Sequence, residues 1–163
     1  EPVLSLGFTK LSGDNDDGNN LTDEDYKGWD PFYENQGGGT IYNALFNATN
    51  IEVFSIGLQG KPREDVVTKL TVTKLYQQLD ISAAAAGTYP LTQPDGTNAN
   101  VNAKEGRQAL GVEIDLEALY DYTEDVQLGL LFGIFKPGRA FDSGSEYDKD
   151  AAKQIIANVN VAF

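Results

Sequence analysis

Six segments of this chain alternate apolar and polar residues at every second position, and this alternation restricts the fold more than any other feature. The segments span residues 2–12, 50–61, 65–79, 107–122, 125–136 and 151–163. A period of two is that of a β-strand whose two faces meet different environments. The sequence therefore predicts six antiparallel strands and no substantial helix.

The segment over residues 109–121 shows the alternation most clearly, whereas the next segment is less regular. In that next segment Leu131 and Phe135 place apolar side chains in the otherwise polar phase. For residues 109–121 we expect a strand with one fully apolar and one polar face. Its apolar phase is Leu110, Val112, Ile114, Leu116, Ala118 and Tyr120, and its polar phase includes Gly111, Glu113, Asp115 and Glu117.

The connections between the segments alternate between long and short. Residues 62–64 and 123–124 are tight turns, whereas the loops 13–49, 80–106 and 137–150 are long and rich in Gly, Asn, Asp and Ala. Brief turns at one end and extended loops at the other are typical of an up-and-down barrel in an outer membrane. We therefore expect an all-β, antiparallel, up-and-down transmembrane β-barrel.

Six strands are too few for such a barrel to close by itself. Membrane-spanning barrels begin at about eight strands, and an open edge in lipid leaves backbone groups unpaired. The chain also begins with Glu1 and contains no Met. We expect residues 1–163 to be a single segment of a larger barrel, completed by further strands of a longer polypeptide or by other subunits.

Composition excludes several classes of function. The chain has no Cys and no His, which removes thiol nucleophiles, thiolate zinc sites and the commonest general base. A net charge of -13 disfavours nucleic acid as a partner. No run approaches the roughly 20 apolar residues of a helical membrane span. We expect neither an enzyme nor a bound cofactor.

Lysines in the apolar phases test whether those faces meet lipid, because a Lys at the middle of a bilayer costs about 2–4 kcal/mol. A tilted strand climbs roughly 2.5 Å per residue along the membrane normal. By that measure Lys74, Lys136 and Lys153 lie about 20–25 Å from the short-turn end, and Lys10 also lies at the loop end of its strand. The sequence therefore predicts that Lys74, Lys136 and Lys153 form an outer rim.

Several short motifs follow one another in a characteristic order. They are Leu6-Gly7-Phe8, Ser12-Gly13-Asp14, Gly28-Trp29-Asp30-Pro31-Phe32, the strand at residues 110–116, Phe135-Lys136-Pro137-Gly138 and the terminal strand ending in Phe163. Together they resemble the carboxyl-terminal portion of the alginate-export family of outer-membrane barrel proteins. The resemblance implies a barrel of about eighteen strands in the outer membrane of Gram-negative bacteria, acting as a passive conduit for polysaccharide or other solute.

The polar phases indicate what would line such a conduit. Glu113, Asp115 and Glu117, with Lys69, are the predicted pore-lining residues, and Glu52 adds to an acidic balance on the polar faces. Acidic walls attract cations and discriminate against anions. We therefore expect a porin-like solute channel rather than a conduit specific for alginate, with the loop 13–49 able to fold inward and narrow it.

Other sites and functions remain open at this level. The acidic stretch from Gly13 to Asp25 contains Asn15, Asp17 and Glu24 at spacings that fit a calcium loop, although a solvated loop explains it as well. A different function is a soluble carbohydrate-binding β-sandwich that uses Trp29 and Tyr33. A third is a structural barrel that only sheathes another protein.

Overall fold

The computed structural model describes residues 1–13, 28–29, 39–45, 49–78, 89–92, 98–101, 109–141 and 150–163, with only the backbone for 89–92, 98–101 and 141. Its main element is a six-stranded antiparallel sheet, which confirms the six predicted strands. In sheet order these are β1 (Val3–Leu11), β2 (Ile51–Arg63), β3 (Val66–Gln77), β6 (Ala109–Asp121), β7 (Val126–Pro137) and β8 (Ala152–Val161).

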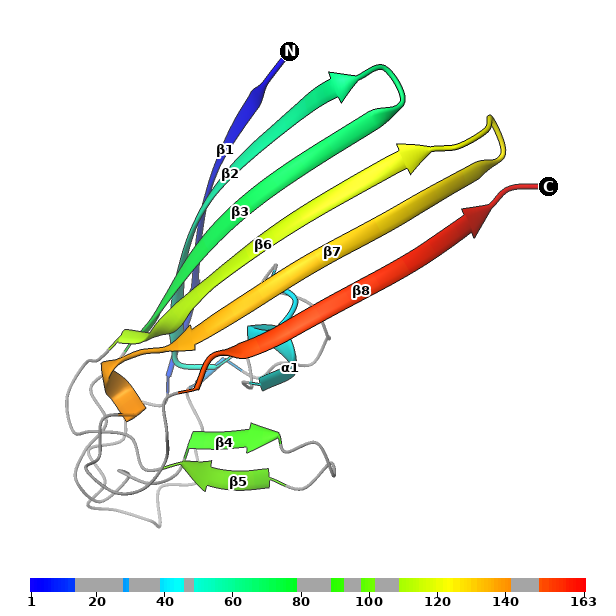
Figure 1. The fold of residues 1–163 in the computed structure, drawn as a ribbon. Coiled ribbons are helices and arrows are strands. Elements are labelled where there is room, and N and C mark those ends of the chain that lie inside the picture. Colours follow the sequence, from blue (N-terminus) through cyan, green and yellow to red (C-terminus); the bar gives the residue numbers. More distant parts are fainter. Residues whose placement is uncertain are drawn as a thin grey trace, which may run out of the picture.

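The sheet has an up-and-down topology, because the order of its strands in space is their order in the chain. The turns at residues 64–65 and 122–125 lie at one end, which we name the turn end (Figure 1). The opposite end, where Leu11, Ile51, Gln77, Ala109, Pro137 and Ala152 lie, is named the loop end. Near it are helix α1 (Tyr42–Leu45), the 3-10 turn η1 (Arg139–Phe141) and the hairpin of β4 (Tyr89–Thr92) and β5 (Asn98–Val101).

The sheet is open within the described part of the chain. β1 and β8 each pair with one neighbour only, and β1 is not paired with β8. The six strands therefore do not close into a barrel by themselves, as their number led us to expect.

Three small elements occur in segments that the sequence pattern assigned to loops. They are α1 in the loop 13–49, the β4–β5 hairpin in the loop 80–106, and η1 in the loop 137–150. Each helix or strand among them is only three or four residues long, which is too short to show a periodic sequence pattern. Among the described residues, no helix has the length and apolar character needed to span a membrane.

One face of the sheet, the apolar face, is exposed across all six strands. Leu6 is 77% exposed, Leu116 47% and Val159 63%. No described element packs against this face to form a second layer. Its exposed side chains include Leu4, Leu6, Phe8, Phe54, Ile56, Leu58, Leu70, Ile114, Leu116, Leu128, Leu130, Phe132, Ile134, Ile155, Val159 and Val161.

The hydrophobic core of the described residues is small and lies on the opposite, polar face. It occupies the loop end, where α1 packs against the sheet. Leu45 and Ala152 border it. Its buried members are Ile41, Tyr42, Ile51, Val53, Leu75, Leu110, Phe135 and Ala140.

Candidate functional site

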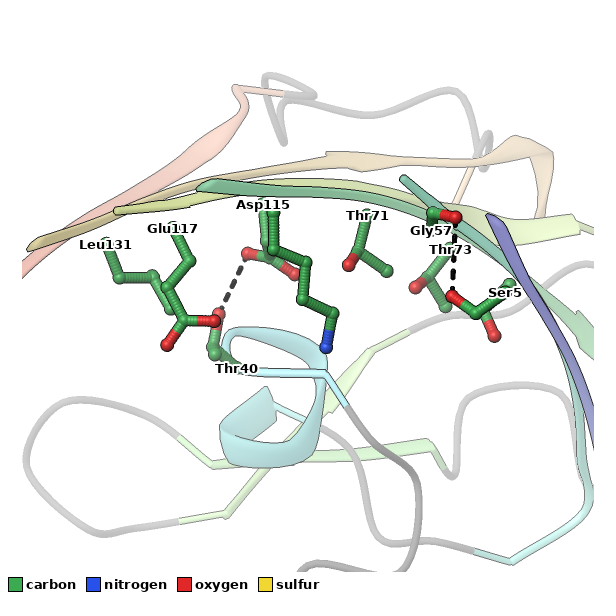
Figure 2. A pocket seen from close by; sticks show the side chains of 10 residues that line it. Ser5, Thr40, Gly57, Thr71, Thr73, Asp115, Glu117 and Leu131 are labelled. Carbon is green, nitrogen blue, oxygen red and sulfur yellow. Dashed lines mark hydrogen bonds between the residues drawn. The ribbon is translucent and has the colours of Figure 1, made fainter. Parts of the chain in front are cut away.

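A polar pocket of about 210 Å³ lies on the polar face, next to the core. Figure 2 shows its labelled side chains pointing from the arching sheet toward α1, with Thr40 facing them from the other side. Hydroxyl groups dominate the lining, and three charged residues join them. The lining residues are Ser5, Thr40, Ser55, Gly57, Lys69, Thr71, Thr73, Asp115, Glu117 and Leu131.

Strand register brings the charged residues of this pocket together. Lys69 on β3 is the direct cross-strand partner of Glu117 on β6, and Thr71 is the partner of Asp115. Direct partners in an antiparallel pair share a face, with Cβ atoms about 5 Å apart. Three of the four predicted pore-lining residues, Lys69, Asp115 and Glu117, therefore line one pocket.

Lys69 and Glu117 differ from Asp115 in their contacts. In the part of the chain that the structure describes, neither Lys69 nor Glu117 makes a hydrogen bond or ion pair within the distance limits of such contacts. Oδ1 of Asp115, by contrast, accepts a hydrogen bond of 3.0 Å from the hydroxyl of Thr40. The pocket thus presents one ammonium and one carboxylate that are available to a solute, and a second carboxylate that is held from one side.

Glu113, the fourth predicted pore-lining residue, has different surroundings. It is fully buried and does not line the pocket. Its Oε1 accepts hydrogen bonds from the Thr40 N–H (2.7 Å), the Thr40 hydroxyl (3.2 Å) and the Ile41 N–H (2.9 Å), and its Oε2 accepts one from the Tyr42 N–H (2.6 Å). The first N–H groups of a helix have no partner within the helix. Glu113 supplies that partner to the start of α1.

Glu52 does not belong to the polar face, so that expectation was wrong. It is two residues before Phe54 and four before Ile56 on β2, so it lies on the same face as these exposed apolar residues. It is the cross-strand partner of Lys10, and their Oε1 and Nζ atoms lie 3.6 Å apart. The acidic balance of the polar face therefore comes from the carboxylates of β6.

The predicted outer-rim lysines lie on the apolar face, in neighbouring cross-strand rows near the loop end. Lys74 and Lys136 both pair with Val112, and Lys153 pairs with Ile134 in the next row toward the turn end. Lys10 lies one row further toward the loop end. The Nζ atom of Lys74 is 5.0 Å from the centre of the Tyr76 ring, a cation–π contact.

The calcium expectation concerns Asn15, Asp17 and Glu24, which lie outside the described residues, as does Tyr33. Trp29 is described, is 40% exposed, and donates its backbone N–H to the carbonyl of Ser12 at 2.9 Å. Within the described ranges no three His, Cys, Asp or Glu residues gather as a metal site would require.

Thr40, Ile41 and Tyr42 are the site residues that sequence reasoning did not identify. Their contacts with Glu113 join positions more than 70 residues apart, and a four-residue helix gives no periodic pattern. One indication was present in the sequence. Phe135 interrupts the polar phase of its strand, and it is 2% exposed because α1 and its neighbours cover it.

Comparison with known proteins adds no relative: no family model, no curated protein and no solved structure matches this chain. Function is therefore inferred from the residues and their arrangement.

Proposed function

We propose that this chain contributes six strands to a β-barrel in the outer membrane of a Gram-negative bacterium, and that the barrel is a passive channel for solute. The observation that carries the proposal is the apolar face, which extends over all six strands and remains exposed. Contiguous apolar patches on monomeric proteins in water rarely exceed a few hundred Å². Acyl chains of a membrane would cover this face without any further protein layer.

The distribution of charge on the apolar face supports the same assignment. Its four lysines lie in three consecutive rows at the loop end, and the paired rows between them and the turn end contain apolar side chains, with Gly60 and the uncharged Thr68 among them. From the Val112 row to the Tyr120 row is about 20 Å along the membrane normal at roughly 2.5 Å per residue. Tyr120 and Tyr122 then lie at the opposite interface, where aromatic residues are favoured.

The open edges require additional strands. Each unpaired backbone group in lipid costs several kcal/mol, so β1 and β8 need partners in the membrane. These partners would be the remaining strands of a longer polypeptide or the strands of other subunits. The resemblance to the alginate-export family favours the first arrangement, in which the six strands are the carboxyl-terminal third of a barrel of about eighteen.

The polar face would then line a hydrated lumen. Lys69 opposes two carboxylates, those of Asp115 and Glu117, so this part of the wall is net negative. Such a wall favours cations over anions, and polyanionic alginate is a poor match for it. We therefore propose a solute channel that works by diffusion, with no catalytic role for the acids and no cofactor.

The alternatives make different demands on the apolar face. A soluble carbohydrate-binding sandwich needs a second layer over Leu116 and Leu130, which are 47% and 38% exposed in this structure. A barrel that sheathes another protein would expose the same face to lipid but would conduct no ions. These differences make the alternatives separable by experiment.

Conductance in planar bilayers tests the proposal. We expect the full-length protein to form channels that prefer K⁺ to Cl⁻, and the double change Asp115→Asn with Glu117→Gln to reduce that preference several-fold. Glu64→Gln is the matched control, because Glu64 is an exposed acid at the turn end. If correctly inserted protein formed no channels, the proposed channel function would be wrong. If the double variant kept the same ion selectivity, Asp115 and Glu117 would not line the lumen.

A further inference from the structure

We infer that Glu113 is a positioning residue, which holds residues 39–45 against the polar face and thereby sets the width of the passage. We name residues 39–45 the docked segment. The inference rests on the proposed function, because the segment narrows a lumen only if the polar face lines one. It gives two roles to the predicted pore-lining acids of β6: Glu113 fixes a constriction, whereas Asp115 and Glu117 determine which solutes pass.

The hydrogen bonds of Glu113 are the first support. Its carboxylate accepts three from the backbone N–H groups of Thr40, Ile41 and Tyr42, and the Thr40 hydroxyl is a fourth donor that it shares with Asp115. A buried N–H group that loses its acceptor must be desolvated without compensation, so removal of this side chain opposes docking. A helix of one turn is not stable by itself, so α1 depends on this carboxylate and on packing.

Packing at the sheet is the second support. Ile41 and Tyr42 are 6% and 3% exposed, and they belong to the same core as Leu75 and Phe135. Gly133 on β7 leaves the space that Ile41 fills, since a Cβ atom on Gly133 would lie 3.1 Å from Ile41 Cδ1. The sheet is thus shaped to receive the segment at this position.

Thr40 connects the docked segment to the pocket. Its hydroxyl lies 3.2 Å from Glu113 Oε1 and 3.0 Å from Asp115 Oδ1, and its single proton can serve only one of them at a time. Thr40 also lines the pocket. Release of the segment would remove this wall of the pocket and leave Asp115 without its Thr40 contact.

The docked segment contains no charged residue. Its release would therefore widen the passage without removing charge from the lumen. This property distinguishes a positioning residue from a lining residue. Loss of docking should raise conductance, whereas loss of the Asp115 or Glu117 charge should alter ion selectivity.

An engineered disulfide between the docked segment and the sheet can show whether the segment is docked, independently of any measurement of transport. The chain has no native Cys, so only an engineered pair reacts. A Cβ atom on Gly133 would lie 3.4 Å from Ile41 Cγ1, which is bonded to Ile41 Cβ, so the side chains of Ile41→Cys and Gly133→Cys would lie next to each other. Replacing Ile41 removes the Cδ1 atom that would crowd a side chain at 133, and the other close atom, Asp115 Oδ1 at 2.8 Å, is the end of a side chain that can turn away.

We expect this pair to oxidise readily in the full-length protein and at least tenfold more slowly when Glu113→Ala is added. Glu117→Ala, on the same strand face, is the matched control and should leave the rate unchanged. An equal rate with and without Glu113 would overturn the inference. If the double variant does not fold, Ile41→Cys alone gives the same test, because its buried thiol should react with a maleimide much faster once Glu113 is removed.

Conductance then connects docking to the lumen. Glu113→Asp keeps the carboxyl group but shortens the side chain, so we expect a conductance increase of about twofold or more with unchanged ion selectivity. The oxidised Cys pair in the same variant should restore the lower conductance. If oxidation depends on Glu113 but no channel forms, the docking role stands and the proposed function fails. If channels form but neither oxidation nor conductance depends on Glu113, the docking role fails alone.

Discussion

The backbone N–H of Tyr42 donates a hydrogen bond of 2.6 Å to Oε2 of Glu113, and this contact joins the first residue of α1 to the polar face of β6. Glu113 belongs to an evenly spaced series with Asp115 and Glu117, yet it is fully buried whereas Glu117 is partly exposed in the pocket. Equal spacing along a strand fixes a shared face but not a shared environment, because another part of the chain covers one end of that face.

Gly133 should be needed for docking of residues 39–45. Its missing side chain accommodates Ile41, and a Cβ atom there would also lie 2.8 Å from Asp115 Oδ1. We expect Gly133→Val to destabilise the fold by about 1–3 kcal/mol through overpacking, and to expose residue 41. Maleimide labelling of the Ile41→Cys thiol measures that exposure. Gly60→Val is the control, since nothing lies within 4 Å of a Cβ atom at Gly60. If both substitutions lowered stability and exposed residue 41 equally, Gly133 would not be needed for docking.

Phe135 should contribute more to stability than its neighbour on the opposite face. Phe135 is 2% exposed in the protein core, whereas Phe132 is 43% exposed on the apolar face. We expect Phe135→Ala to lower the free energy of unfolding by about 3–5 kcal/mol, the usual cost of emptying a core phenylalanine site. Phe132→Ala should cost less, because lipid fills the space. Urea unfolding of protein folded into vesicles measures both, and a larger loss at Phe132 would refute the assignment.

Leu130 and Leu131 are adjacent in sequence and differ only in the face they occupy. Leu130 lies on the apolar face in the row of Ala118, near the middle of the strands, and Leu131 lines the polar pocket. We expect Leu130→Lys to cost about 2–4 kcal/mol of folding free energy in lipid. Leu131→Lys should cost less than about 1 kcal/mol, as surface substitutions do, since Glu117 is its cross-strand neighbour. Unfolding in vesicles measures both free energies. If Leu130→Lys cost no more than Leu131→Lys, the face that contains Leu130 would not be the one that meets lipid.

Tyr42 should make the docked segment sensitive to alkali. Burial, and secondarily the negative charge of Glu113, raise the pKa of Tyr42 from 10.0 to about 12. Between these values the unfolded chain has lost the phenolic proton and the folded chain retains it, so stability falls as pH rises. The loss attributable to Tyr42 is about 2–3 kcal/mol.

Unfolding of Tyr42→Phe at several pH values checks this dependence. The variant should lose less stability between pH 10 and about 12 than the unaltered protein does. Tyr122→Phe is the matched control, because Tyr122 is 63% exposed. If Tyr42→Phe lost as much stability over this pH range as the unaltered protein, the pKa of Tyr42 would not be raised by folding.

The alternation of residue types was sufficient to predict the sheet. The pattern over residues 109–121 identified β6 by itself, and the alternation of short and long connections gave the up-and-down order. These predictions succeeded because they depend on local periodicity and on chain connectivity, both of which are visible in one sequence. The open edges followed from the number of strands, because six are too few to close a membrane-spanning barrel, and the described residues form an open sheet.

The interior of the site was less predictable because it depends on distant contacts. Leu110 follows the apolar phase in sequence, yet it is fully buried in the polar-face core. The register shifts between Leu75 and Tyr76, and the irregularity leaves Leu110 without a cross-strand partner on β3. A period of two cannot reveal such a shift, nor can it reveal that residues 40–42 will cover Glu113.

Site-directed spin labelling measures whether the apolar face of the sheet meets lipid. Single cysteines at Leu116 and Glu117 in this cysteine-free chain place nitroxides on opposite faces of one strand. In vesicles containing the full-length protein, we expect the label at 116 to collide with oxygen more than with a water-soluble nickel complex, and the label at 117 to show the reverse. A label at 116 that is shielded from both, or that prefers the nickel complex, would contradict this expectation.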